Sequence, residues 1–160
     1  MARISTYTGS SLEVTLTEAL TIDSRDYGGT NTYSISSIQD VTRRIVTIPT
    51  SEVTLATFAA AVGAGAYIAA DVMYVRFTNL DDTNFVTLTF RNQDNDEVAI
   101  KLDAGKSFIL SADNSGGMVD IFNATQDADA ASDTNLGDLT NIQADANTAT
   151  VDLEMYIASK

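Results

Sequence analysis

Four aspartates near the C-terminus, Asp127, Asp129, Asp133 and Asp138, are the residues of this chain best suited to binding chemistry. The first three lie in or at the end of a small, polar, acidic stretch, NATQDADAASD, that covers residues 123–133. Carboxylate oxygens at such spacings are typical of calcium loops, because Ca²⁺ is a hard cation that takes oxygen ligands. The pattern departs from a regular loop of this kind at Ala131, Ser132 and Asp138, where an oxygen donor, a glycine and a glutamate are usual. A solvated acidic loop is the alternative prediction, and we expect the protein to need no cofactor.

Catalytic chemistry has little support in the composition. The chain contains neither histidine nor cysteine, so no histidine-assisted nucleophile, no thiol and no ordinary zinc site can be built. Ser107 with Lys101 or Lys106 is the remaining nucleophile and base combination, but Lys106 belongs to a predicted turn, where a solvated lysine is usual. Carboxylate pairs for glycoside hydrolysis stay open, although among so many acids no pair stands out. We therefore predict a protein that is not an enzyme.

The charge balance restricts the partners. Nine Lys and Arg residues against 22 Asp and Glu residues give a net charge of −13, and the basic residues are scattered except at Arg43-Arg44. Nucleic acid is not an expected partner, because phosphate binding requires clustered cations. No apolar run reaches membrane-spanning length and the N-terminus lacks a secretory signal, so we expect synthesis in the cytoplasm and no membrane partner. We predict one domain over residues 1–160, in which roughly the first ten residues can form an extended arm.

The stretch 72–110 carries the strongest strand signals. Apolar residues alternate with polar ones over 72–78, 86–91 and 98–103, as in strands with one buried face. The first connector contains Asp81, Asp82 and Asn84, the second covers residues 92–96, and the third contains Gly105. Each can reverse the chain, because short Asx side chains cap their own backbone and glycine accepts positive φ. The pattern predicts an antiparallel meander of neighbouring strands.

Further strands are predicted on both sides of this stretch. Alternation indicates strands over 12–16, 33–35, 44–48, 108–110, 119–121 and 151–157, with a hairpin tip over 26–31 and a strand end or sheet edge at Pro49. Helical spacing of Leu55, Phe58, Ala59 and Val62 favours a short helix over 54–62, with a strand as the alternative. The fold class we predict is all-β: an antiparallel β-sandwich, Greek-key or jelly-roll-like, with at most one short helix.

Two exposed faces are the candidate interaction surfaces. The outer face of the predicted meander would carry Tyr74, Arg76, Thr87, Thr89, Arg91 and Lys101, and the outer face of the last strand would carry Asp152, Glu154 and Tyr156. If the two faces met between subunits, their opposite charges would set the register of a homo-oligomer. Two solvated faces are the alternative.

Several segments together resemble a known class of proteins. They are RRIVTIPTSEVTLATF, DVMYVRFTNLDDTNFVTLTF, IKLDAGKSFIL and QADANTATVDLEMYIASK. From about Arg43 onward the chain is similar to small β-rich structural proteins of the virions of tailed bacteriophages. The features shared with that class are the strand 74–81, the hairpin 101–110 and the Ala-rich segment with its closing strand, 144–157.

The resemblance implies a non-enzymatic virion component, assembled in a bacterial cytoplasm. An accessory head protein that decorates or cements the capsid is the first expectation. Its expected partners are further copies of itself, with a trimer as one form, and the major capsid protein. A tail or neck component is the second expectation. A binding module for glycans or a host surface is the third, with Tyr27, Tyr33 and Tyr67 as its aromatic platform.

Overall fold

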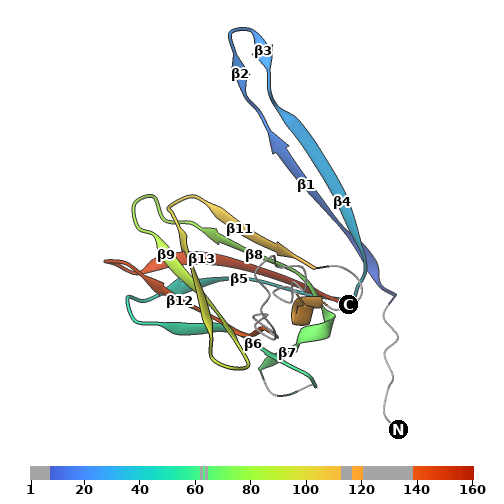
Figure 1. Cartoon of the computed structure of the whole chain (residues 1–160), viewed down its shortest axis with the longest axis vertical. Helices are drawn as coiled ribbons and strands as arrows, with labels where there is room; N and C mark the ends of the chain where they lie inside the picture. Colours follow the sequence, from blue (N-terminus) through green and yellow to red (C-terminus); the bar gives the residue numbers. More distant parts are fainter. Residues whose placement is uncertain (1–7, 62, 64, 113–116, 121–138) are drawn as a thin grey trace, which may run out of the picture.

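The protein is a β-sandwich with a long two-stranded arm that projects from one end (Figure 1). The structure is a computed structural model that describes residues 8–61, 63, 65–112, 117–120 and 139–160. In these ranges the regular structure is strand apart from two short 3₁₀ helices, η1 (Ala69–Asp71) and η2 (Gly117–Asp120). The predicted all-β sandwich is confirmed.

Two sheets make up the sandwich. The first has five strands in the order β10 (Glu97–Leu102), β9 (Val86–Asn92), β12 (Leu139–Ala146), β6 (Val53–Ala59) and β7 (Ala66–Ile68). The second has four strands in the order β11 (Ser107–Ser111), β8 (Val72–Asn79), β13 (Val151–Ser159) and β5 (Asp40–Ile48). All neighbours pair antiparallel except β6 and β7, which pair in parallel. The edge strand β5 stops just before Pro49, as the sequence predicts.

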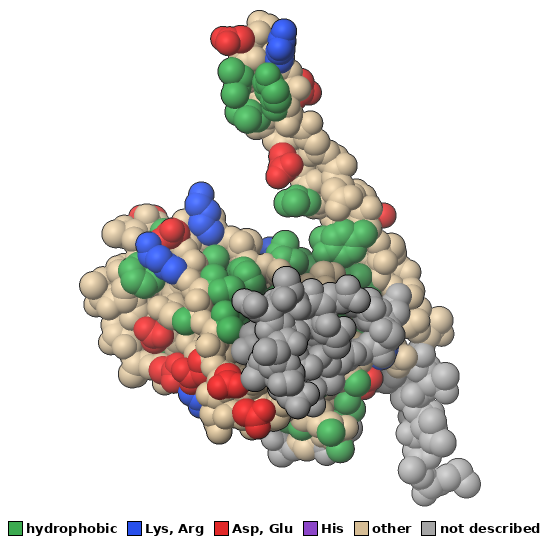
Figure 2. Space-filling view, in the orientation of Figure 1, with side chains coloured by type: hydrophobic (Ala, Val, Ile, Leu, Met, Phe, Trp, Pro, Cys, Tyr) green, Lys and Arg blue, Asp and Glu red, His purple; other side chains and the backbone are tan. Residues whose placement is uncertain are grey.

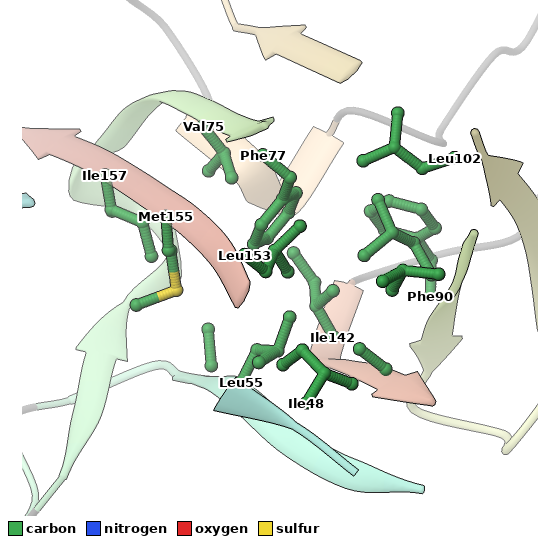
Figure 3. Packing of buried hydrophobic residues seen from close by; sticks show 14 of the residues in the cluster. Ile48, Leu55, Val75, Phe77, Phe90, Leu102, Ile142, Leu153, Met155 and Ile157 are labelled. Carbon is green, nitrogen blue, oxygen red and sulfur yellow. The ribbon is translucent and has the colours of Figure 1, made fainter. Parts of the chain in front are cut away.

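The core lies between the inner faces of the two sheets. Phe77, Leu153 and Met155 of the four-stranded sheet are fully buried, as are Leu88 and Ile142 of the five-stranded sheet. These side chains belong to one cluster, shown in Figure 3. Because alternate residues of each strand face inward, the apolar alternation read from the sequence becomes this core.

The predicted meander is confirmed for its second and third strands, β9 and β10, which pair antiparallel, but it is wrong for its first strand, β8. β8 pairs with β11 and β13, whereas β9 pairs with β10 and β12 in the other sheet. The loop over 80–85 therefore carries the chain from one sheet to the other. Strand periodicity identifies which face is buried but not which strand lies alongside, so sequence adjacency was the wrong guide to the partners of β8.

Two local predictions also need correction, and one strand was missed. Residues 53–59 form strand β6 rather than a helix, in keeping with the β-branched Val53, Thr54 and Thr57 that pack well on a pleated sheet. The predicted strand over 119–121 is replaced at its start by η2, with Met118 buried. Strand β12 was not predicted, yet it lies in the middle of the five-stranded sheet.

The arm consists of β1 (Ser10–Glu18) paired with β4 (Gly29–Ile38), and of β2 (Thr21–Ile22) paired with β3 (Arg25–Asp26) at its end. The predicted strands over 12–16 and 33–35 are confirmed as strands, but they belong to the arm and not to the sandwich. The chain reverses at Asp23 and Ser24, with φ of 49° and 68°, which is before the tip predicted over 26–31. Two successive positive φ values match the tight turn that suits the twist of a hairpin.

Candidate interaction site

The candidate site is built from the arm and from the outer face of the four-stranded sheet. The arm carries an apolar stripe on one side, made by alternate residues of β1 and their partners on β4. Leu12 pairs with Ile35 and Val14 pairs with Tyr33. The other side is polar, and there Thr15 and Thr17 lie within hydrogen-bond distance of Thr32 and Thr30 through their hydroxyls.

The first half of the apolar stripe is covered by the sandwich. Ile35 and Ile38 are buried in a second hydrophobic cluster with Met73, Tyr74 and Ala158 of the sheet, and the arm residues Leu12, Val14 and Tyr33 pack against this cluster. The ring of Tyr74 meets that of Tyr156 edge to face, with centroids 5.8 Å apart. Burial raises the pKa of the Tyr74 hydroxyl, despite the opposing effect of nearby Arg76.

The outer part of the arm, from Leu16 to the tip, carries uncovered apolar side chains. Leu16, Leu20, Ile22 and Tyr27 are 54%, 52%, 52% and 58% exposed. Figure 2 shows hydrophobic side chains at the tip of the arm, well away from the sandwich. Among the described residues, half of the large hydrophobic side chains that are exposed therefore lie on the outer part of the arm.

A cleft of about 450 Å³ opens between the arm and the sheet. Leu12, Val14 and Leu16 of the arm line one wall, together with Glu13 and Thr15, and the sheet wall is formed by Tyr74, Arg76, Ser107, Ile109 and Tyr156. The hollow between arm and sandwich is visible in Figure 2. Both walls are thus mainly apolar, with a few polar groups between them.

An arginine, glutamate and arginine trio lies beside the cleft. Arg43 Nε and Nη2 donate to Glu154 Oε2 at 3.0 and 2.8 Å, and Arg76 Nη2 donates to Glu154 Oε1. The hydrogen bond from Arg43 is the main reason why the pKa of Glu154 lies below its ordinary value. The positive charge of Arg76 lowers this pKa further. Arg76 also lies over the ring of Tyr156, 5.8 Å from its centroid. Two guanidinium groups share one carboxylate, so the trio has a net charge of +1.

The trio lies on a face with exposed apolar side chains. In the register of the sheet Ile109, Arg76, Tyr156 and Arg43 form one row across the four strands. Ile45, beside Glu154 in the next row, is 60% exposed and Ile109 is 40% exposed. The outer face of this sheet therefore combines uncovered apolar surface with exposed charged groups, among them Arg43 with its 66% exposed side chain.

The predicted interface residues are distributed differently from the expectation. Arg76, Asp152, Glu154 and Tyr156 do share a face, but Arg91 and Lys101 belong to the other sheet, together with Thr87 and Thr89. The opposite charges of Arg76 and Glu154 meet within one chain. Tyr74 is only 5% exposed, because the base of the arm packs on it.

The remaining candidates have local roles or lie outside the described residues. Arg91 forms an ion pair with Glu97. Lys101 Nζ lies 2.7 Å from Asp103 Oδ1 and over the ring of Phe85. Asp152 Oδ1 accepts a hydrogen bond of 2.8 Å from Thr47 Oγ1. The calcium candidates Asp127, Asp129, Asp133 and Asp138 all fall in the segment 121–138, outside the described residues. Elsewhere, in the ranges that the structure describes, no three acidic side chains gather as a metal site would need.

The three tyrosines proposed as a platform lie apart. Tyr27 follows β3 at the arm tip, Tyr33 packs at the arm base, and Tyr67 of β7 packs against Phe58 with ring centroids 6.2 Å apart. Two of the three serve packing, so they form no common aromatic surface.

The geometry defines a β-sandwich protein with a projecting, partly apolar arm. The chain matches no family model and no curated protein. One solved structure is similar, described as "Bacillus endospore appendages form a novel family of disulfide-linked pili". It aligns with a TM-score of 0.44 and 10% identity, covering 100% of this chain and 96% of that chain. Among the described residues, no helix has the length and apolar character needed to cross a membrane.

Proposed function

We propose that this chain is a non-enzymatic structural protein of a tailed-bacteriophage virion, an accessory head protein that decorates or cements the capsid lattice. The observation that carries the proposal is the outer arm, whose four large apolar side chains face water in the isolated chain. Uncovered apolar surface is unfavourable in water, and contiguous patches of it mark interaction sites. An assembly in which a neighbour covers the arm removes this cost.

The sequence resemblance supplies the virion setting, and the charge agrees with it. A net charge of −13 suits the outside of a particle better than contact with the packaged genome. A β-sandwich gives a rigid body, and the arm gives reach. From Val14 to Ile22 a strand spans about 25 Å, enough to extend over an adjoining subunit.

Co-sedimentation tests the proposal. The purified chain is mixed with heads and, separately, with tails of a tailed phage whose genome encodes it, and the pelleted fraction is measured. Saturable binding to heads is the expected result. Binding to tails alone would reassign the chain to the tail or neck, and binding to neither particle would overturn the proposal. Repeating the assay with calcium and with a chelator shows whether the acidic segment contributes.

A further inference from the structure

We infer that the outer part of the arm of one copy binds in the cleft between the arm and the four-stranded sheet of a second copy. This deepens the function proposed above and rests on its premise that the chain assembles with its neighbours. The occupant we assign to the cleft is therefore the group of apolar side chains at the arm tip of another subunit, Leu20, Ile22 and Tyr27.

The apolar stripe of the arm is the first reason. Its inner half is covered by the sheet of its own chain, and its outer half is 52–58% exposed at four large side chains. An isolated two-stranded hairpin is marginal in water and gains stability when a further apolar surface packs on it. A second copy offers such a surface, because the apolar walls of the cleft are exposed beside the base of its own arm (Figure 2).

Location is the second reason. The arm rises away from its own sandwich, so its tip is directed outward rather than into its own cleft (Figure 1). Large exposed hydrophobic side chains in the described residues fall mainly into two groups: the outer arm, and the outer face of the four-stranded sheet with Val41, Ile45 and Ile109. The side chains of the arm tip, Leu20, Ile22 and Tyr27, do not line the cleft of their own chain, so they are free to meet that of another copy.

Charge is the third reason. Residues 16–30 contain three acids, Glu18, Asp23 and Asp26, and one base, Arg25, which gives a net charge of −2. The sheet face beside the cleft carries two arginines, Arg43 and Arg76, and two acids, Glu154 and Asp152. Arg43 is 66% exposed at its side chain, so an acid of the docked arm can pair with it. Complementary charges of this kind set the orientation of a docked segment.

The symmetry of the assembly follows from this contact. The donating surface and the accepting surface are different parts of the same chain, so the contact is heterologous. Such contacts close into a ring when the rotation permits and otherwise continue as a line of subunits. Every subunit in a ring then has its arm covered and its cleft filled.

Cross-linking between two single-cysteine variants tests the inference. The chain has no cysteine, so each introduced thiol is unique. Ile22→Cys places a thiol on the arm tip, Ile109→Cys places one in the cleft, and Ala99→Cys places a control thiol on an exposed position of β10 in the other sheet. All three positions are at least partly exposed, so the variants should fold.

Equimolar mixtures are treated with a short bis-maleimide and the cross-linked heterodimer is quantified. We expect the Ile22→Cys and Ile109→Cys pair to exceed the Ile22→Cys and Ala99→Cys pair at least about tenfold, because docked thiols meet at effective concentrations of the order of mM. Equal yields overturn the inference. A dominant product joining two Ile22→Cys chains also overturns it, since that result means tip-to-tip contact.

The two proposals fail separately. Cross-linking uses only the purified chain, whereas the functional test uses phage particles. We call the docking of one subunit's arm in the cleft of the next arm exchange. Capsid binding without the predicted cross-link would rule out arm exchange but would still support the virion function. The predicted cross-link without binding to any particle removes the virion function and leaves an arm-linked oligomer.

Discussion

Gly117 fills a position that no other residue can occupy without strain. It begins η2 with φ of +61°, and a Cβ there would lie 2.5 Å from the carbonyl oxygen of Ala70 and 2.7 Å from that of Ala69. We expect Gly117→Ala to lower the free energy of unfolding by about 3 kcal/mol or more, because the left-handed conformation alone costs about 1–2 kcal/mol and backbone must also shift.

Gly105→Ala is the matched control for this prediction. Gly105 also has positive φ, +69°, but a Cβ there would meet nothing within 4 Å. Gly105→Ala should therefore lower the free energy of unfolding only by the conformational cost, about 1–2 kcal/mol. Urea unfolding of both variants separates the two effects, and equal losses would show that the close approach between η1 and η2 is not rigid.

Glu154 links stability to pH. Its pKa is lower in the folded chain than in the unfolded chain, so its stabilising effect is complete above the unfolded value of about 4.3 and is lost as pH falls through the folded pKa. We expect Glu154→Gln to lower the free energy of unfolding by about 1 kcal/mol at pH 7, and by less at pH 3 as the carboxylate becomes protonated.

Urea titrations at the two pH values measure this difference. Glu97→Gln is the control, because Glu97 has a 44% exposed side chain and pairs with Arg91 in the same manner at the other sheet. Glu97→Gln should lower the free energy of unfolding at pH 7 by less than about 0.5 kcal/mol. A loss at Glu154 that persists unchanged at pH 3 would mean that packing, and not charge, explains the effect.

At the scale of elements, a buried asparagine holds the loop that crosses between the sheets. Asn79 is 1% exposed; its Nδ2 donates to the carbonyls of Asn84 and Leu102, and its Oδ1 accepts from the backbone N–H of Asp81. Asp81 Oδ1 then accepts from the N–H groups of Thr83 and Asn84, which lowers the pKa of Asp81. The chain is thereby fixed at the point where it leaves β8 for β9.

We expect Asn79→Ala to lower the free energy of unfolding by about 2 kcal/mol, because it leaves buried carbonyls without a donor. Thermal or urea unfolding measures the loss, and hydrogen exchange in the loop 80–85 should rise. Asn147→Ala, at an exposed position, is the control and should be near neutral. A neutral Asn79→Ala variant would show that water replaces the amide at little cost.

The elements also show how far sequence reasoning reaches. The Asx-rich connector at 81–84 and the positive φ of Gly105 were predictable, because the side-chain chemistry acts within a few residues. The sheet pairing was not, because β8 and β13 meet across more than seventy residues of chain. β12 was missed since its small inward residues, Ala144 and Ala146, give a weak apolar alternation.

The candidate site was predictable only in part. Arg76, Glu154 and Tyr156 were identified as surface residues from alternation, but their contact with one another depends on register between distant strands. The apolar arm went unrecognised because Leu12, Val14 and Leu16 have the same pattern as a strand that is buried in a core. Exposure of Leu16 and Ile22 becomes evident only when the arm is seen to leave the sandwich.

At the scale of the whole molecule, arm exchange makes stability depend on concentration. Folded subunits that associate are stabilised by mass action, whereas unfolded chains gain nothing. Each tenfold rise in protein concentration above the dissociation constant then contributes about 1.4 kcal/mol per contact. For a domain of this size the midpoint of thermal unfolding should rise by about 3–5 °C per tenfold rise.

The double variant Leu20→Ser with Ile22→Ser should abolish this dependence, because both side chains lie on the exposed outer arm and not in the core. Ala99→Ser, on the opposite sheet, should keep it. Scanning calorimetry over a hundredfold range of concentration, with light scattering for molar mass, makes the comparison. A dependence that survives in the double variant would place the contact between subunits elsewhere on the sandwich. A wild-type midpoint that stays constant while the molar mass remains that of a monomer would show that the exposed arm is stable without a second copy.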